Sequence, residues 1–481
     1  MPCRAAVALG GIIVSVTLCA CAHTETSRGF ADVQSLTSDR IGQRVHWYQG
    51  TAEDAAVADT IRSLLSEELT AQSAVQVALL KNPALQATFE ELGITQADLV
   101  QAGLLKNPVF LASARFPDRP PSSTNLEFAV IEDFLDVFMR PLRKEMAGLQ
   151  FEQAQLRVAD AVLELSAKTK QQFYTLQGEQ EVARLQQPLF EAADAALDLA
   201  RRQHAVGNID ELDLGMHESA CHAAKIELMH REAQVVIHRE RLNRLMGLSG
   251  DETDWKLADS LPELPLDEEE LQALLDRADS QRLDLQAARK ETEIIEQAIK
   301  LTRGSVLGAV EIGVDTERET DETVVTGPTL QLGVPIFDHG QARRARQQAQ
   351  LRQSRYRIKE MELIVASEVR SAYTRLSAAR TMAEYCRNEV VPLRTRMVSL
   401  SQQYYDAMIM GAYALLKTKE NEVRAQRQYT EALADYWIAR SEVERAVGGS
   451  LKAEIPLTPA PMPVPRPEME MPQPHHHGGH E

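Results

Sequence analysis

The sequence is poor in aromatic residues and in cysteine. Phe, Trp and Tyr together make up 5% of the 481 residues, and long tracts are instead rich in Ala, Leu, Gln, Glu and Arg, the residues of extended helices. The five cysteines show neither the spacing of a metal site nor a framework of disulfides. Cys221 and Cys386 lie in helical sequence, where they are expected to pack as small apolar residues. A mainly helical chain without disulfide bonds is therefore predicted.

Basic residues are scarce relative to acidic ones. With 52 Lys and Arg against 70 Asp and Glu, the formal net charge is −18, so no basic patch would dominate the field and nucleic acid is excluded as a partner. The sequence also lacks a motif that places a nucleophile beside a base, a phosphate-binding glycine loop or a paired acidic site. Neither an enzymatic activity nor a resident cofactor is predicted.

The N-terminus has the pattern of a secretion signal. Arg4 is followed by an apolar run over residues 5–18, which is too short to span a bilayer as a mature helix. The run ends in Leu18-Cys-Ala-Cys21, which resembles a bacterial lipobox, in which Cys21 would be lipidated and become the first mature residue. Residues 1–20 are therefore predicted to be a lipoprotein signal peptide and residues 21–60 an acylated, extended segment. Ordinary signal cleavage nearby is the alternative.

Four short segments alternate between apolar and polar residues, as strands do. They form two pairs, at about residues 108–116 and 124–132 and at about residues 306–315 and 328–335. Alternation of this kind fits a transmembrane β-barrel strand and a half-buried strand of a soluble sheet equally well. Four strands are too few to close a single-chain barrel, which needs at least about eight. If these strands span a membrane, several chains must share one barrel.

The helices that follow each strand pair carry apolar residues on two opposite sides. In each half, one heptad row lies two residues from a second row, which places the two rows roughly 200° apart around the helix. The rows are Leu149-Leu156-Leu163 and Phe151-Val158-Leu165 in the first half, and Leu351-Ile358-Val365 and Ala349-Tyr356-Leu363 in the second. A helix in a simple hairpin needs one such seam, whereas a helix in a ring of helices needs two.

The chain is an internal duplication. Leu85-Gln-Ala87 recurs as Leu285-Gln-Ala287, and glycine turns near Gly207 and Gly411 interrupt the long helical runs of both halves. The predicted order in each half is helix, strand, strand, long helix, glycine turn and helix. We expect a first repeat at residues 61–247, an acidic linker at 248–270, a second repeat at 271–448, and a disordered tail rich in Pro, Met and His at 449–481.

Together these features resemble the TolC-type outer-membrane factor family. The resemblance covers residues 60–450 and includes Asn82-Pro-Ala-Leu85, the run from Gly103 to Val109 that leads into the first strand, and the order of the duplicated elements. It implies a mainly helical homotrimer with a small β part, in which three chains share one twelve-stranded barrel in outer-membrane lipid above a periplasmic helical barrel.

The resemblance also implies a function and partners. Such a protein is the passive exit duct of a tripartite efflux system in the outer membrane of a Gram-negative bacterium, here lipid-anchored through Cys21. Its partners would be a periplasmic adaptor (membrane fusion protein) and an inner-membrane pump of the RND type. Gly207 and Gly411 would form the periplasmic tip at which the adaptor docks, with Leu212 and Leu416 just inside.

A charged entrance gate is implied at the same tip. Some family members narrow the entrance with aspartates six and nine positions after the second glycine, where this chain has Lys417 and Glu420. Asp213 occupies the sixth position after the first glycine. A lysine ring paired with Glu420 or Asp213 would close the entrance in place of an all-aspartate gate. Charges without a gating role at a solvated hairpin end are the alternative.

The tail carries ligands suited to soft and borderline metal ions. Thioethers suit Cu(I) or Ag(I), and imidazoles suit Cu(II), Zn(II) or Ni(II). The candidate ligands are Met469, Met471, His475, His476, His477 and His480. The chain also resembles, around residues 405–411 and 434–437, factors associated with metal-efflux operons, which favours copper or silver as cargo. The sequence leaves open a plain disordered tail, a duct for drugs or for type I protein secretion, and a lipid-anchored periplasmic coiled-coil scaffold.

Overall fold

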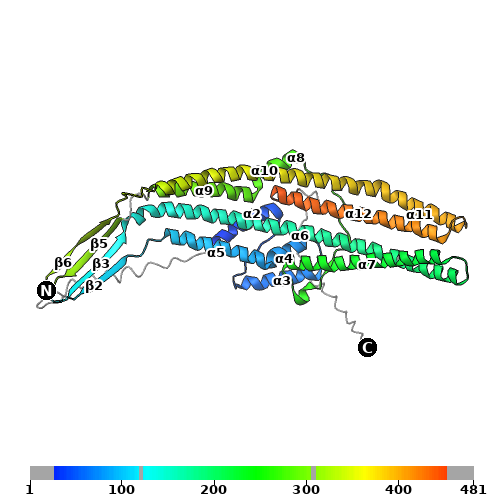
Figure 1. Cartoon of the computed structure of the whole chain (residues 1–481), viewed down its shortest axis with the longest axis horizontal. Coiled ribbons are helices and arrows are strands. Elements are labelled where there is room, and N and C mark those ends of the chain that lie inside the picture. The colour runs from blue at the N-terminus through cyan, green and yellow to red at the C-terminus, as the bar shows by residue number, and fades with distance from the viewer. Residues whose placement is uncertain (1–26, 117, 119–122, 305–309, 452–481) are drawn as a thin grey trace, which may run out of the picture.

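The computed structural model describes residues 27–116, 118, 123–304 and 310–451. The protein is a long rod with a four-stranded sheet at one end and two helical hairpins at the other (Figure 1). The predicted fold class, mainly helical with a small sheet and a duplicated order of elements, is confirmed. No helix in the described ranges is long and apolar enough to cross a membrane.

The sheet contains β2 (Val109–Arg115), β3 (Asn125–Asp133), β5 (Val310–Arg318) and β6 (Val324–Leu332). All three strand pairs are antiparallel, and the strands lie in the order β2-β3-β5-β6. The two hairpins of the duplicated halves are therefore joined through β3 and β5. This leaves β2 and β6 as the two edges of the sheet, each with one unpaired side.

The two faces of the sheet differ in polarity because the register aligns the alternating residues of all four strands. One row of opposed residues is apolar, namely Phe110, Val130, Val314 and Pro328. An opposed row on the other face is polar, namely Ser113, Glu127 and Glu317. The apolar face is open to its surroundings: Phe110 is 64% exposed and Val314 is 56% exposed.

The second strand pair is displaced from its predicted position. Residues 305–309 lie outside the described residues, and β5 continues to Arg318 while β6 already begins at Val324. The predicted strands, at about 306–315 and 328–335, left residues 316–327 outside the sheet. In the structure this segment extends the pairing, because the Thr316 and Thr326 hydroxyls meet across the strands at 3.1 Å and Arg318 pairs with Val324. Only residues 319–323 form the turn.

A layer of four helices continues the sheet. It consists of α5 (Pro83–Gly103), α6 (Phe134–Ala205), α9 (Leu283–Gly304) and α10 (Gln341–Tyr385). Contacts run from α5 to α6, from α6 to α9 and from α9 to α10, so the helices repeat the order of the strands to which they connect. The open edges of this layer are therefore α5 and α10.

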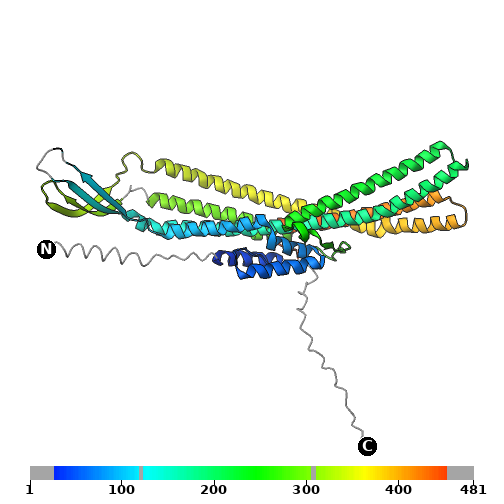
Figure 2. The same ribbon diagram turned by 90° about the horizontal axis from the view of Figure 1, so that it is seen from below.

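Beyond the middle of the rod the two halves become helical hairpins. Helix α7 (Glu211–Met246) returns along α6, and α12 (Ala412–Val447) packs against α6, α10 and α11 (Val391–Asp406). A short π-helical segment, Cys386–Val390, joins α10 to α11. Figures 1 and 2 show both hairpins reaching the same end of the rod, opposite the sheet.

The two apolar seams differ in α10. Val365 is buried, and the row Leu351-Ile358-Val365 lies on the covered side of the helix, where Ser354 bonds to Thr292 of α9 at 3.1 Å. The other row is open: Tyr356 is 71% exposed and Leu363 is 74% exposed. In a single chain, one seam is therefore used and the other remains at the edge of the layer.

The C-termini of α7 and α12 are built alike. Gly247 and Gly448, with φ of +70° and +81°, end these helices in the left-handed conformation that favours glycine. Each glycine also packs against a helix–helix corner. A Cβ on Gly247 would lie 2.9 Å from the Lys81 carbonyl oxygen, and one on Gly448 would lie 3.1 Å from the Gln281 carbonyl oxygen. These two glycines mark equivalent positions of the duplicated halves.

The segment after the predicted signal peptide is not extended over its described part. Residues Ser27–Ile41 form α2 and residues Ala52–Ser66 form α3, and both stand on one side of the layer (Figure 2). Val33 is fully buried, and the ring of Phe30 meets that of Phe89 on α5 edge-on at 5.1 Å. The prediction of an extended segment at residues 21–60 is wrong here because spaced apolar residues give α2 a face that packs on the layer.

The predicted acidic linker, residues 248–270, is packed against the rod. Its strand β4 (Lys256–Leu257) pairs in parallel with β1 (Glu68–Leu69), between α3 and α4 (Ala71–Lys81), and α8 (Leu271–Gln281) follows it. Trp255 is 2% exposed, and its indole N–H donates to the Asn243 side-chain oxygen at 2.8 Å. A few apolar anchors thus fix a segment whose overall composition is polar.

Candidate functional site at the helical tip

The first tip turn joins α6 to α7. Gly207 adopts φ +76°, and the Asn208 N–H donates to the Gln203 carbonyl at 2.8 Å, which closes the end of α6. Asp210 then caps α7, because its carboxylate accepts the Asp213 N–H at 2.8 Å.

The second tip turn uses a different residue for the same conformation. Met408 adopts φ +58°, and the Ile409 N–H donates to the Tyr404 carbonyl at 2.8 Å. Gly411 has φ −80° and an extended backbone, and it lies at the N-cap of α12. Both predicted glycines thus lie in the tip turns, but they are not equivalent. Met408 corresponds to Gly207, and Gly411 corresponds to Asp210.

This shift changes the correspondence of the residues inside the tip. Leu212 is the second residue of α7, and its counterpart in α12 is Tyr413, whereas Leu416 lies about one turn further along the helix. Leu212 is 69% exposed, and Leu416 is half-buried. Pairing the two glycines by sequence missed Tyr413. The matching C-caps Gly247 and Gly448 point to it, since both helices contain 36 residues.

Tyr413 connects the two hairpins of the protomer. Its hydroxyl donates to the Gln203 side-chain oxygen on α6 at 2.9 Å. Its ring stacks on His217 of α7, with ring centroids 4.1 Å apart. One side chain at the start of α12 therefore holds the end of α6 and the beginning of α7 at once.

The gate candidates pair within α12. Lys417 Nζ lies 2.7 Å from a Glu420 carboxylate oxygen, and Arg424 binds the other oxygen at 2.8 Å. Lys417 and Asp213 are not joined by an ion pair among the described residues. A single protomer thus contains the predicted Lys417–Glu420 pair, in an exposed intrahelical position where such a pair contributes about 0.3–0.5 kcal/mol.

The tip presents an apolar surface to its surroundings. Its two turns expose large apolar side chains, namely Val206 at 72%, Leu212 at 69%, Met408 at 95% and Ile409 at 74%. We call these four residues the tip crown. Exposed apolar side chains are not stabilised by contact with water. Patches of this kind are typical of surfaces that bind another protein.

A charge cluster fixes α12 against α6 near the middle of the rod. Arg445 lies 2.6 Å from Glu164 and 3.0 Å from Asp160, both on α6, and Lys170 lies 2.6 Å from Glu444. Burial raises the pKa of Asp160, although Arg445 opposes this. We call these five residues the equatorial charge cluster. It joins the C-terminal part of α12 to α6.

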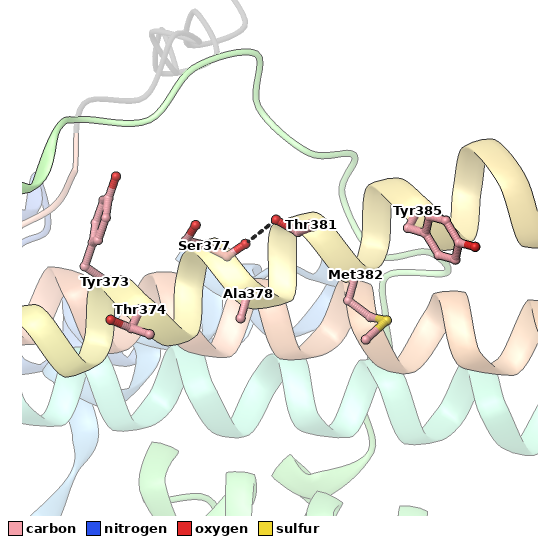
Figure 3. A pocket seen from close by; sticks show the side chains of 7 residues that line it. All are labelled: Tyr373, Thr374, Ser377, Ala378, Thr381, Met382 and Tyr385. Carbon is pink, nitrogen blue, oxygen red and sulfur yellow. Dashed lines mark hydrogen bonds between the residues drawn. The ribbon is translucent and has the colours of Figure 1, made fainter.

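An open groove of about 570 Å³ runs along α10. Figure 3 shows that its lining side chains all come from this one helix, and they include Tyr373, Met382 and Tyr385. Tyr385 is 60% exposed and Met382 is 57% exposed. The groove holds no acid–base pair. Within the described ranges, no group of three or more His, Cys, Asp or Glu residues is placed to bind a metal ion. The tail candidates, Met469 to His480, lie outside the described residues.

The family model named outer membrane efflux protein matches residues 140–248 and 274–449, which contain α6 from residue 140 onward and α7 in one half, and α9 to α12 in the other. No curated protein sequence matches the chain.

Solved structures share the fold at low sequence identity. The outer membrane protein VceC of Vibrio cholerae is 15% identical with a TM-score of 0.63, over 82% of this chain and 97% of that chain. The open state of the Neisseria gonorrhoeae MtrE channel is 14% identical with a TM-score of 0.65, over 79% and 89%. The Campylobacter jejuni CmeC channel is 13% identical with a TM-score of 0.62, over 88% and 93%. Both the family and these structures are outer-membrane channels rather than enzymes.

Proposed function

Since the chain belongs to the outer membrane efflux protein family, whose members are outer-membrane channels with helices in the periplasm, we propose that it is the passive exit duct of a tripartite efflux system. Three copies form the duct. The proposal's main support is the sheet: four strands with one apolar and one polar face, and with unpaired edges at β2 and β6. Joining β6 of each copy to β2 of the next would remove every edge.

Detergent extraction tests the assembly. The wild-type protein should stay in the membrane fraction until detergent is added, and it should then migrate as a trimer that collapses to a monomer on heating. A water-soluble monomer would contradict the duct and favour the alternative of a periplasmic coiled-coil scaffold.

The tip crown is the proposed docking surface for the periplasmic adaptor, which couples the duct to an inner-membrane pump of the RND type. Its support is the exposure of Leu212 and Ile409 at the end of the rod. Introducing a charge there, as Leu212→Asp with Ile409→Asp, should abolish efflux while the trimer persists. Leu266→Asp is the matched control, because Leu266 is 80% exposed but lies in the 248–270 segment. Normal efflux in the tip variant would contradict docking at the crown.

An acyl anchor at Cys21 agrees with the position of α2. The side chain of Gln155 on α6 donates to the Asp32 carboxylate at 2.8 Å. Helix α2 therefore lies beside the part of α6 that is nearer the sheet, and Ser27 is at the end of α2 nearer the sheet. Cys21 precedes Ser27 by six residues, a stretch that can span at most about 20 Å. Phe151 lies beside Gly29 and 17 residues into α6, about 26 Å from the sheet end of that helix. This length is sufficient to bring Cys21 close to the level of the sheet.

Palmitate labelling tests the anchor. Cys21→Ser should abolish incorporation of radiolabelled palmitate, and Cys19→Ser, two residues away, should retain it. Equal labelling in both variants would contradict the assignment of Cys21.

Copper or silver ions are the proposed cargo, with the Met/His tail as a collector at the duct. The support is the set of soft ligands in residues 459–481. A strain that lacks the whole protein should lose tolerance to copper and silver. A strain that lacks only residues 459–481 should lose part of that tolerance and keep its tolerance to organic drugs. Unchanged metal tolerance in both strains would exclude this cargo and leave drugs or secreted proteins.

A further inference from the structure

The two open edges of the helical layer carry opposite charge. Between residues 341 and 359, α10 has seven basic residues and no acidic one, in a chain whose net charge is −18. The seven are Arg343, Arg344, Arg346, Arg352, Arg355, Arg357 and Lys359. Helix α5 has the reverse composition, with Glu90, Glu91 and Asp98 and no Lys or Arg. These helices lie on opposite sides of the layer, so within one chain they cannot neutralise each other.

On each helix the charges alternate with exposed apolar residues along one stripe. On α5 the stripe is Glu91, Ile94 and Asp98, spaced so that all three share a face, and Ile94 is 63% exposed. We call it the acidic edge. It is directed away from the buried residues Phe89 and Leu92, which belong to the core between α5 and α6.

The corresponding stripe on α10 is Arg352, Tyr356, Lys359 and Leu363. Lys359 Nζ lies 5.9 Å from the centre of the Tyr356 ring, so the two side chains share this face. Tyr356 and Leu363 form the open apolar seam described above. We call the four residues the basic edge.

The contacts across the layer place both edges at one height along the rod. Gln347 of α10 bonds to Thr302 of α9 at 2.7 Å. Five residues further from the sheet, Gln297 of α9 bonds to Glu145 of α6 at 2.7 Å. Lys144, next in sequence, packs on Gly103 of α5. By the same five-residue step, Arg352 of α10 lies level with Gln297, whereas the bond between Ser354 and Thr292 places residue 349 there. Arg352 therefore lies within about 5 Å of the level of Gln297 and Gly103.

Each helical residue advances 1.5 Å along the rod. On the side of this level that faces away from the sheet, basic residues of one edge therefore alternate with acidic residues of the other. Measured from this level away from the sheet, Arg352 lies at about 0–5 Å, Asp98 at about 7 Å, Lys359 at about 10–15 Å and Glu91 at about 18 Å. Ile94 falls between Tyr356 and Leu363. Opposite charges and complementary apolar residues would therefore interdigitate if the two edges were brought together.

The charges of both edges are also free to accept a new partner. No hydrogen bond or ion pair joins the side chains of Glu91, Asp98 or Arg352 to another residue in the part of the chain that the structure describes. A rotation that carries one copy of the layer to the next in a closed ring keeps heights unchanged, and it brings α5 of one copy against α10 of its neighbour.

We propose that the acidic edge of each copy docks on the basic edge of the next, so that this charge-matched seam sets the contact between protomers of the trimer. This seam rests on the proposed function, because its partner is the second copy of the chain in the trimeric duct. Charge complementarity of this kind selects the correct register. It also disfavours contact between two acidic edges or between two basic edges.

Charge reversal with rescue tests the seam. Arg352→Glu with Lys359→Glu should reduce the heat-modifiable trimer at least about tenfold, because each of the three seams then opposes like charges. Glu91→Lys with Asp98→Lys should do the same. The chain that combines all four substitutions should recover the trimer to within about twofold of wild type, since the charges are then exchanged. Asp59→Lys with Arg62→Glu is the matched control on α3, outside the layer, and should retain the trimer.

A trimer that persists in both double variants would overturn the seam, and so would a fourfold variant no better than the weaker double variant. Either result leaves a trimeric duct intact if the wild-type protein is itself a trimer, so failure of the seam is distinguishable from failure of the proposed function.

Disulfide trapping is independent of folding stability. Ile94→Cys with Leu363→Cys should give covalently linked dimers and trimers under oxidation, and each single variant should not. Absence of linked species in the double variant would also overturn the seam.

Discussion

Replacing Arg445 by methionine tests the equatorial charge cluster. Methionine keeps most of the side-chain volume but leaves Asp160 and Glu164, one helical turn apart on α6, without their shared cation. Removing one partner of a buried pair typically costs about 3–5 kcal/mol. The two carboxylate side chains here are 20% and 39% exposed, so solvent screening lowers the expected loss to about 2 kcal/mol. In a chain of this size the loss corresponds to a fall in Tm of about 2 °C.

The loss should also depend on pH in a defined direction. The pKa of Asp160 is already raised by burial, and Arg445 is the group that most opposes this shift. Without Arg445 the folded-state pKa rises further above its value in the unfolded chain. A carboxyl group whose folded-state pKa is raised destabilises the protein as pH increases past the unfolded value. The deficit of the variant should therefore be smaller at pH 5 than at pH 8.

Thermal unfolding followed by circular dichroism in detergent measures both effects, with the oligomeric state checked before each scan. Arg424→Met is the matched control, because Arg424 lies on the same helix in an exposed pair with Glu420, and its loss should stay below about 0.5 kcal/mol. A change below that value in Arg445→Met, or an equal deficit at pH 5 and pH 8, would refute the role assigned to the cluster.

Three further substitutions test the caps and the tip. Gly247→Ala should lower stability by about 1–2 kcal/mol, because alanine is strained at φ +70° and its Cβ would meet the Lys81 carbonyl. Gly215→Ala is the control in the same melting assay. It should be neutral or slightly stabilising, because Gly215 lies within α7 with open space around the added Cβ. Tyr413→Phe should weaken the link between the hairpins by about 1 kcal/mol, seen as faster hydrogen exchange at the start of α12, and unchanged exchange would count against the link. Lys417→Ala should raise the conductance of the duct in planar bilayers if the Lys417–Glu420 pair contributes to closing the entrance; an unaltered conductance would exclude that contribution.

The sequence was sufficient to predict the architecture because the spacing of apolar residues differs between strands and helices. Alternation over short segments indicated the strands, and two heptad rows indicated a helix with neighbours on both sides. The structure places Leu363 on the open row and Val365 on the covered one. That difference had no signal in the sequence, since it depends on which neighbour belongs to the same chain.

The tip turns show where sequence reasoning fails. Glycine tolerates positive φ, so Gly207 and Gly411 were paired as equivalent turns. The second turn instead places Met408 at positive φ and uses Gly411 as a helix cap. Side chains of this type rarely adopt that conformation, and local propensity therefore pointed to the wrong residue. Counting back from the matched caps of α7 and α12 gives the correct alignment.

Helix α2 was missed for a different reason. Residues 27–41 are mostly polar, and the apolar residues that make them helical, such as Phe30 and Val33, gain stability only against α5 and α6. A short helix of this kind is stabilised by tertiary packing rather than by its own propensity. The partner surface is distant in sequence, so no local pattern predicts the contact.

The account depends most directly on three chains sharing one barrel. Cryo-electron microscopy of the detergent-extracted wild-type protein measures this without any substitution. The account predicts a three-fold symmetric particle in which β6 of each copy pairs with β2 of the next and α10 lies against the neighbouring α5. A particle of one chain, or a trimer whose sheets remain separate, would contradict it.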